Sequence, residues 1–405
     1  MKKMILYVGN FVYPNGNAAG KRVLGNVKAI KGVGYSTAVF CFRNTNEGSY
    51  LQKDTIEDTL MYTIPYSDGL PRLNNHKVFS RFRDVLTQLK SQYQIAGVIM
   101  YTTLGTVDFN VKVIKTCHKN NIKVYYDFCD YFSDISKNNF LKYLIKKSDL
   151  NLLNTSVLPN CDGIITISSY LKDKTNRKDV CVTVPPLSAE DDIQQVKNDN
   201  VSPVISYASF LSDTNRPVCE WKDRIDVILD VFVYIKKQYP EIKFLLKFIG
   251  FSEENLLNMF LVHERSAYRD KIEFLSDHVV FLGKCDNYKA QSEIMNSDFT
   301  ILIRDSKEST NAGFPTKVSE SISLGIPVIV NLTSDLKQYI EDEKNGFIVS
   351  NPDNVREIGE QVKEIISMDN MRINEMKEYT LRTNPFHYSK YVTVFEDYFN
   401  KMEMK

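Results

Sequence analysis

The feature that most constrains this chain is an alternation of short apolar runs with longer amphipathic stretches, which continues along all 405 residues. Strands that alternate with helices of this length predict parallel sheets with helices on both faces. In the first half, the expected strands are residues 4–9, 36–42, 60–65, 97–101, 122–128, 163–167 and 180–184. Helical periodicity in the same half covers residues 21–31, 77–93, 107–120 and 140–153.

The second half repeats the pattern and predicts a second sheet of the same kind. Its expected strands are residues 204–208, 244–250, 278–282, 299–303, 327–331 and 346–349. Its expected helices are residues 223–238, 287–296, 316–324, 334–342 and 355–368. The predicted fold class is therefore α/β, with two Rossmann-like, doubly wound domains.

The domain boundaries follow from composition. A chain of this length is too long for one core, and a polar, acidic stretch with prolines at both edges separates the two halves. We expect an N-terminal domain at residues 1–188, a linker at 189–202 and a C-terminal domain at 203–384. The aromatic-rich stretch 385–405 is expected to form a helix that packs back on the first domain. Ligands of such sheets bind outside the carboxyl ends of the strands, which we expect to face each other across a cleft.

Composition excludes several other classes of protein. Apolar residues make up 43% and charged residues 25% of the chain, which argues against a disordered, collagenous or disulfide-rich secreted protein. No apolar run approaches the ~20 residues that cross a bilayer, and the first apolar run is too short for a signal peptide. The seven cysteines are scattered, never in CxxC spacing, and the five histidines show no metal-binding spacing. These patterns predict a reducing cytosol and no metal site.

The net charge of +1 conceals an asymmetry between the halves. Residues 1–188 hold 25 basic and 14 acidic side chains, whereas the remainder holds 26 basic and 36 acidic ones. A basic half suits an anionic partner, and both nucleic acid and an anionic membrane qualify, as does a chance difference between solvated faces. Two basic amphipathic stretches, residues 72–90 and 137–147, could lie against anionic lipid or form solvated helix faces.

The most informative stretch is a buried strand at 298–304 followed by a glycine-containing loop and a helix that begins near Thr316. Gly313 lets the backbone approach a ligand closely. Thr316 and Lys317 stand where free backbone N–H groups at a helix start can hold an anion. Glu320 lies one turn into the helix, where its carboxylate can accept two hydroxyl hydrogen bonds from a ribose.

The run Gly-Phe-Pro-Thr-Lys at 313–317, then Glu320, then Gly-Ile-Pro-Val-Ile at 325–329, resembles the retaining glycosyltransferases of the GT-B fold, family four. It is most similar to the branch that assembles bacterial polysaccharides such as capsule, lipopolysaccharide and O-antigen. The resemblance continues at residues 281–283, 345–349 and 352–353 and covers the second half. It implies that the donor is bound by Gly283, Lys284, Gly313, Phe314, Pro315, Thr316, Lys317 and Glu320.

One position departs from that family. Its members usually carry two glutamates separated by seven residues, the first of which contacts the transferred sugar, and here that first position is Ala312. The branch with the Gly-Phe-Pro-Thr-Lys run often lacks this glutamate, so the departure bears on the sugar more than on the fold.

A second constellation combines the strand at 205–210 with a basic turn before the next helix. The resembled branch has Lys-Asp-Gly-Ile-Asp here, and its lysine holds the donor diphosphate. Lys222 takes that role by resemblance, and Arg224, which stands where glycine is common, is a further expected donor-binding residue. A fixed cation stabilises the charge that develops on a leaving diphosphate. Arg304 and Arg216 are further candidates for the same task.

In the first domain, Gly16 lies in the loop between the first strand and the first helix, where backbone amides could reach a diphosphate or an acceptor. The strand at 122–128 leads into two carboxylates and an aromatic ring, and Asp127, Asp130 and Tyr131 are candidates for the acceptor side. Capping of the next helix is an alternative role for these residues.

The resemblance implies a hexosyltransferase that moves a sugar from a nucleoside diphosphate donor, expected to be UDP-linked, to a hydroxyl of a glycan or lipid-linked acceptor with retention. Lys222, Asp130 and Glu320 are the expected catalytic residues. No cofactor, no metal and no nucleic acid partner are expected, and the location is cytoplasmic, with peripheral contact at the inner membrane face through the basic half. Ala312 motivates an alternative, a non-catalytic partner of a glycan-assembly complex with the same fold. A dehydrogenase is disfavoured, because neither domain has GxGxxG after its first strand.

Overall fold

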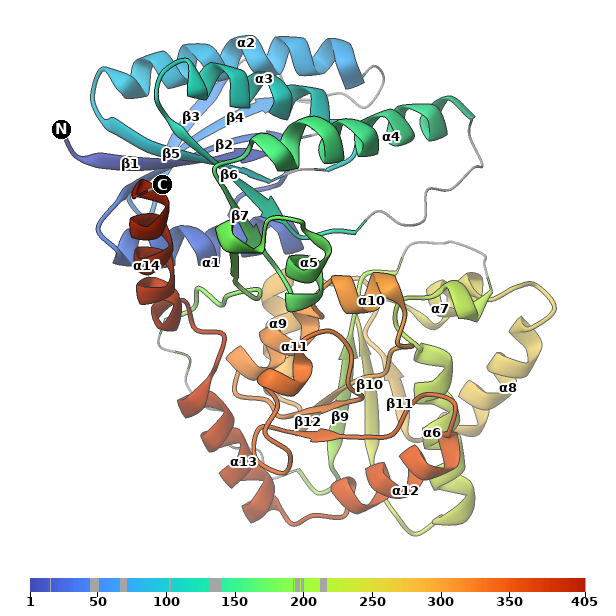
Figure 1. Cartoon of the computed structure of the whole chain (residues 1–405). Helices are drawn as coiled ribbons and strands as arrows, with labels where there is room; N and C mark the ends of the chain where they lie inside the picture. Colours follow the sequence, from blue (N-terminus) through green and yellow to red (C-terminus); the bar gives the residue numbers. More distant parts are fainter. Residues whose placement is uncertain are drawn as a thin grey trace. The chain divides into compact units, whose positions relative to one another are not determined.

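The chain forms two compact units, each built around one sheet (Figure 1). The computed structural model describes residues 1–14, 16–43, 51–65, 71–101, 103–131, 140–191, 193, 197, 200–211 and 217–404. The first unit comprises Met1–Ala189, Ala312–Phe314 and His387–Lys405, and the second comprises Glu190–Asn311 and Pro315–Phe386. Arg216 and residues 137–139 lie outside the described residues.

The sheet of the first unit has eight strands in the order β3-β4-β2-β1-β5-β6-β7-β8, and every neighbouring pair is parallel except β3 and β4. The strands are β1 (Lys3–Gly9), β2 (Ser36–Arg43), β3 (Gln52–Ile56), β4 (Thr59–Pro65), β5 (Gln94–Tyr101), β6 (Lys123–Phe128), β7 (Gly163–Thr166) and β8 (Cys181–Thr183). The α-helices of this unit are α1 (Ala18–Gly32), α2 (Pro71–Lys90), α3 (Val107–His118), α4 (Phe140–Leu152), α5 (Ser169–Lys174) and α14 (Val392–Glu403). Central strands such as β1 are almost continuously apolar because both faces of the sheet are covered.

The sheet of the second unit has six strands, all parallel, in the order β11-β10-β9-β12-β13-β14. The strands are β9 (Val204–Ala208), β10 (Leu245–Ile249), β11 (Val279–Phe281), β12 (Phe299–Leu302), β13 (Val328–Val330) and β14 (Gly346–Ile348). The helices are α6 (Ile225–Gln238), α7 (Glu253–Met259), α8 (Arg265–Phe274), α9 (Asn287–Met295), α10 (Glu308–Ala312), α11 (Thr316–Ser323), α12 (Val355–Ile366) and α13 (Asn370–Thr383). This order is that of a doubly wound sheet, in which the connections reverse direction between β9 and β12. The predicted α/β class with two Rossmann-like domains is therefore confirmed.

The last helix packs within the first unit. The hydroxyl of Tyr398 donates to the carbonyl of Val180 at 3.1 Å, and the ring of Phe399 meets the edge of Tyr125 with 5.2 Å between centroids. These aromatic contacts anchor α14 beside the strands of the first sheet, although the hydrogen-bonded Tyr398 and Val180 are 218 residues apart in the chain.

One expected helix was wrong, and one edge strand was not expected. Residues 334–342 do not form a helix: only the short 3₁₀ turn Leu336–Gln338 forms there, between left-handed residues Ser334 (φ 52°) and Glu343 (φ 61°). Apolar spacing alone predicted that helix, but the left-handed positions stop a regular helix on both sides. Strand β3 was missed because its residues are polar and almost all exposed, as at the edge of a sheet.

At the amino end of β12, a buried lysine fastens α13 to the sheet. Lys377 is 1% exposed, and its ammonium donates to the carbonyl of Ser297 at 2.7 Å and lies 3.8 Å from Oδ1 of Asp298. Burial lowers the pKa of Lys377 from 10.5 to about 8, although the carboxylate of Asp298 acts in the opposite direction. The folded state thus releases this proton at lower pH than the unfolded state, so this group makes stability rise between pH 8 and pH 10.5.

In the wild type, this lysine should raise the free energy of unfolding by up to about 3 kcal/mol across that pH interval. The Lys377→Met variant should lack this rise. Urea unfolding followed by the fluorescence of Trp221, the single tryptophan, which is buried in the second unit, measures it at pH 7.5 and pH 10. The exposed Lys337→Met variant should keep the wild-type pH dependence. Parallel stability curves for the wild type and Lys377→Met would show that this lysine does not titrate as described.

Candidate functional site

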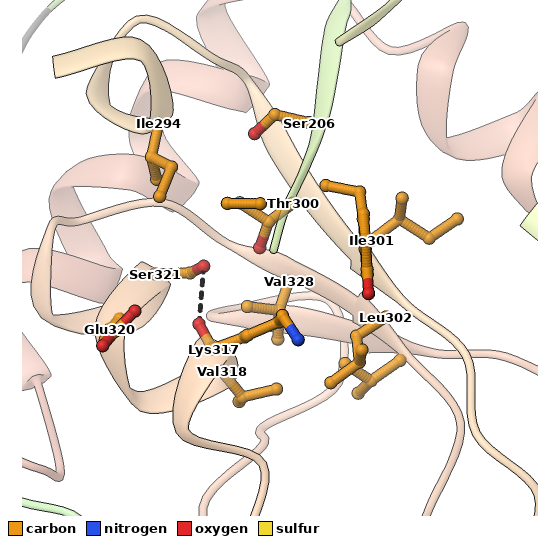
Figure 2. Close-up of a pocket in the computed structure, with 13 residues that line it drawn as sticks. Ser206, Ile294, Thr300, Ile301, Leu302, Lys317, Val318, Glu320, Ser321 and Val328 are labelled. Carbon is orange, nitrogen blue, oxygen red and sulfur yellow. Dashed lines mark hydrogen bonds between the residues drawn. The ribbon is translucent and has the colours of Figure 1, made fainter. Parts of the chain in front are cut away.

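The candidate site lies in the second unit, at the carboxyl ends of β9 and β12. The connections leave these two neighbouring strands in opposite directions, and ligands of doubly wound sheets bind where this happens. A small pocket of about 20 Å³, room for a water molecule, lies there between β9, β12, β13 and α11, as Figure 2 shows. Its polar lining comes from Ser206, Thr300, Lys317, Glu320 and Ser321.

Helix α11 is built to leave its first turn open. Its N-cap is Pro315, which supplies no side-chain hydrogen bond to the first amides. At the other end, the N–H of Gly325, whose φ of +77° favours glycine, donates to the carbonyl of Ile322 at 3.0 Å and ends the helix. Backbone N–H groups and the positive end of the helix dipole are therefore presented at Thr316 and Lys317.

Two polar groups of α11 and β9 point to a ligand that donates and accepts hydrogen bonds. Glu320 is half-buried and lines the pocket beside Ser321, whose hydroxyl donates to the carbonyl of Lys317 at 2.8 Å (Figure 2). The hydroxyl oxygen of Ser206 is buried in the pocket wall, and no partner for it is found among the described residues. Such an orphaned hydroxyl is uncommon in a protein interior and suits a polar guest.

The electrostatic centre of the site is Asp223, which precedes α6. Its carboxylate accepts from Nζ of Lys317 at 2.6 Å, from Nε of Arg304 at 2.7 Å and from the hydroxyl of Tyr207 at 2.8 Å. Burial acts to raise the pKa of Asp223, but the two cations and their hydrogen bonds outweigh it and hold the pKa well below its usual range. Asp223 is consequently ionised at neutral pH, and one net positive charge remains on the cluster of Asp223, Lys317 and Arg304.

Tyr207 is the neutral member of this group. Burial and the neighbouring carboxylate of Asp223 raise its pKa well above the usual value, so the phenol stays protonated and acts as a donor. The ammonium of Lys317 also lies 5.3 Å from the centre of the Tyr207 ring, in a cation–π arrangement. These contacts hold Lys317 at the carboxyl ends of the strands, while 27% of its side chain stays exposed.

The guanidinium of Arg224 is engaged by two carboxylates. It bonds the carboxylate of Asp226 at 2.7 Å and that of Asp305 at 2.6 Å. The hydrogen bond that Arg224 donates to Asp226, together with the negative charge of that carboxylate, raises the pKa of Arg224 further above its usual value, against the effect of burial. Arg224 therefore serves to tie the start of α6 to the loop after β12, with its charge balanced by two carboxylates.

The other predicted donor-side residues of the second half lie around the carboxyl edge. Lys222 is exposed directly before Asp223. Gly283 has a φ of +65° and open space around it, and it follows β11 with the exposed Lys284, two strands away from β9. Gly313 and Phe314 are buried and are grouped with the first unit by their contacts.

In the first unit, Asp127 is part of the core instead of an open surface. It is 1% exposed, and its carboxylate accepts from Nη2 of Arg22 at 2.7 Å and from the hydroxyl of Tyr7. Arg22 also donates to the carbonyl groups of Val184 and Pro185. This burial argues against the predicted contact of Asp127 with an acceptor, because the carboxylate is already bonded on both oxygens.

The remaining predicted residues of the first unit stay accessible. Asp130 is exposed after β6, and Tyr131 is half-buried, with its ring against Tyr170 and 5.4 Å from the ammonium of Lys174. Gly16 is exposed, and its N–H donates to the carbonyl of Val12 at 3.1 Å.

Among the described residues there is no group of three or more His, Cys, Asp or Glu side chains arranged to hold a metal ion. In the same part of the chain, no helix combines the length and the apolar character that crossing a membrane requires.

Comparison with known proteins supports a transferase. Residues 218–382 match the model of the family described as Glycosyl transferases group 1. An uncharacterized glycosyltransferase of Haemophilus influenzae is 22% identical over 356 residues, which cover 84% of this chain and 85% of the relative.

Solved structures share the fold over the whole chain. The catalytic domain of starch synthase IV from Arabidopsis thaliana, bound to ADP and acarbose, matches with a TM-score of 0.68 and 12% identity, covering 100% of both chains. Anabaena HepE in complex with UDP matches with a TM-score of 0.60 and 13% identity, covering 98% of this chain and 99% of its own. The fold, the family match and the relative together support a glycosyltransferase of the GT-B type.

The Asp223 cluster gives a prediction about stability. Replacing Asp223 by Asn should lower the free energy of unfolding by about 3 kcal/mol at pH 7, because Lys317 and Arg304 lose the carboxylate that balances them. Since the pKa of Asp223 is lowered by folding, its contribution is present above pH 4 and is lost as the pH falls. The difference between wild type and variant should shrink by about 1 kcal/mol between pH 6 and pH 3.

Urea titrations read by Trp221 fluorescence measure this difference, and the exposed Asp353→Asn variant is the control that should not change. Equal stability of wild type and Asp223→Asn at pH 7 would contradict the role given to this carboxylate.

Proposed function

We propose that this protein is a retaining glycosyltransferase that moves a hexose-type sugar from a UDP-linked donor to a hydroxyl of a glycan or lipid-linked acceptor in bacterial surface polysaccharide synthesis. The observation that carries the proposal is the open amide end of α11 together with Lys317 and Glu320 in one pocket at the switch between β9 and β12. The structural neighbours named for complexes with UDP, UDP-glucose and ADP support a nucleotide as the ligand.

In this proposal the diphosphate of the donor sits against the first turn of α11. The backbone N–H groups and the helix dipole favour an anion there, and Lys317 adds a positive charge. Glu320, one turn further along, accepts hydrogen bonds from the two ribose hydroxyls. Lys222, exposed shortly before α6 begins at Ile225, supplies a second cation for the phosphates.

The chemical step then depends mainly on positive charges that are held beside the leaving diphosphate. The bond between the sugar and the phosphate oxygen breaks, a new bond forms between the sugar and the acceptor oxygen, and the acceptor proton passes to the departing phosphate oxygen. Negative charge develops on the leaving diphosphate, where the cations and the helix end stabilise it more than in the ground state. The side chains named here perform this without a metal, and Asp130, exposed after β6, is the proposed carboxylate on the acceptor side.

We further propose that the enzyme works in the cytoplasm, at the inner face of the membrane. A lipid-linked acceptor resides there, and the basic half of the chain suits an anionic surface.

A non-catalytic role in a glycan-assembly complex is the second candidate. Ala312 is fully buried and offers no carboxylate at the position where related enzymes usually contact the sugar. Under this alternative, nucleotide binding would persist without turnover.

The function is tested by adding a panel of nucleotides and nucleotide sugars to the purified chain and recording the melting temperature and donor hydrolysis. UDP and one UDP-sugar should raise the melting temperature, because a ligand of the folded state stabilises it by mass action. The Glu320→Gln variant should bind UDP about tenfold more weakly, since hydrogen bonds to a charged acceptor contribute about 1.5–3 kcal/mol.

The exposed Glu378→Gln variant, in α13, is the matched control and should bind as the wild type does. Binding of UDP with no hydrolysis or transfer would favour the non-catalytic alternative. Equal UDP affinity of Glu320→Gln and wild type would contradict the placement of the ribose.

A further inference from the structure

A second pocket lies in the first unit, between α2 and α3. It has a volume of about 530 Å³ and is formed by one face of α2 and the end of α3. The two helices are held together beneath it by aromatic contacts of Phe79 and Phe82 with Phe109. The residues that line it are Phe79, Arg83, Leu86, Thr87, Lys90, Thr116, Lys119 and Asn120.

The lining combines positive charge with an apolar floor. Arg83, Lys90 and Lys119 line the pocket and no acidic residue does. Lys90 donates to the side-chain oxygen of Asn120, whereas Arg83 and Lys119 are exposed and have no ion-pair partner among the described residues. Phe79 and the buried Leu86 supply an apolar surface beside these cations.

This pocket is separate from the edge of the first sheet where ligands of doubly wound domains bind. Helix α2 ends at Lys90, shortly before β5 begins at Gln94, and α3 ends at His118, shortly before β6 begins at Lys123. The ends of both helices thus adjoin the amino ends of parallel strands. A donor or acceptor is expected at the carboxyl ends, on the opposite edge.

The helix dipole offers a simpler explanation for two of the three cations that line the pocket. Lys90 and Lys119 stand at the carboxyl ends of α2 and α3, where cations complement the helix dipole. Arg83 does not fit that explanation, because it lies two turns before the end of α2 and still lines the pocket. A basic helix face that only contacts solvent also does not account for a pocket that Phe79 lines.

We propose that the α2–α3 pocket binds the phosphate headgroup of an anionic lipid at a membrane surface, with the three cations on the phosphate and Phe79 and Leu86 beside the apolar part. The combination of cations with an apolar floor matches a phosphate that is attached to an apolar chain, and the excess of basic residues in the first unit draws it to an anionic surface. The inference rests on the proposed work at a membrane and names the surface that makes the contact.

The test is co-sedimentation of the full chain with vesicles of phosphatidylcholine, with or without phosphatidylglycerol, at constant ionic strength. Wild type should bind only the vesicles that contain phosphatidylglycerol. The double variant Arg83→Glu/Lys119→Glu should bind them at least tenfold more weakly. The control Lys243→Glu/Lys337→Glu changes the charge by the same amount at exposed positions of the second unit and should bind as the wild type does.

Three results would overturn the inference: no binding of wild type to anionic vesicles, an equal loss in both double variants, or displacement from the vesicles by millimolar inorganic phosphate. The last would mean that the pocket takes free phosphate. The melting-temperature shift with UDP is recorded on the same variants. A UDP shift without vesicle binding would reject the lipid site alone, and vesicle binding without any nucleotide shift would reject the proposed transfer alone.

Discussion

The carboxylate of Asp223 is the interaction on which the candidate site depends. It joins β9 through Tyr207, the loop after β12 through Arg304, and α11 through Lys317, and it stands itself at the start of α6. Four segments from distant parts of the chain therefore meet at one charge. Because that carboxylate is ionised, it holds Lys317 at the open turn of α11 without cancelling the positive charge of both cations.

The first unit also contains a carboxylate paired with a cation, but there the pair is fully buried. Asp127 and Arg22 form an ion pair whose side chains are 0% and 2% exposed, so the charges are enclosed and satisfied. In the second unit, Lys317 keeps 27% of its side chain exposed beside the pocket. An enclosed pair fixes a fold, whereas a partly open cluster with a net charge can also hold an anion. This difference in exposure, more than the residue types, separates the structural pair from the candidate site.

The similarity to solved glycosyltransferases is one of fold, since the sequence identities are only 12–13% for the two structures described above. Function has to be argued from the site, because one fold can serve many reactions. Here the fold places the amide end of α11 and a carboxylate on the same helix, one turn apart, at the edge where nucleotides bind in doubly wound sheets.

The sequence alone determined the alternation of strands and helices, the two parallel sheets, the helix after Pro315 and the glutamate one turn into it. These features are set by local periodicity and by short motifs, which a sequence displays directly. Only the tertiary structure decided which charged side chains pair with one another. Asp223 lies 81 and 94 residues from the cations that it binds, and no local pattern predicts that meeting. The same reason explains why Asp127 was expected at an open surface: its burial depends on Arg22, which approaches from 105 residues away. Charges separated so far in the chain meet only when the order of the strands brings their ends together.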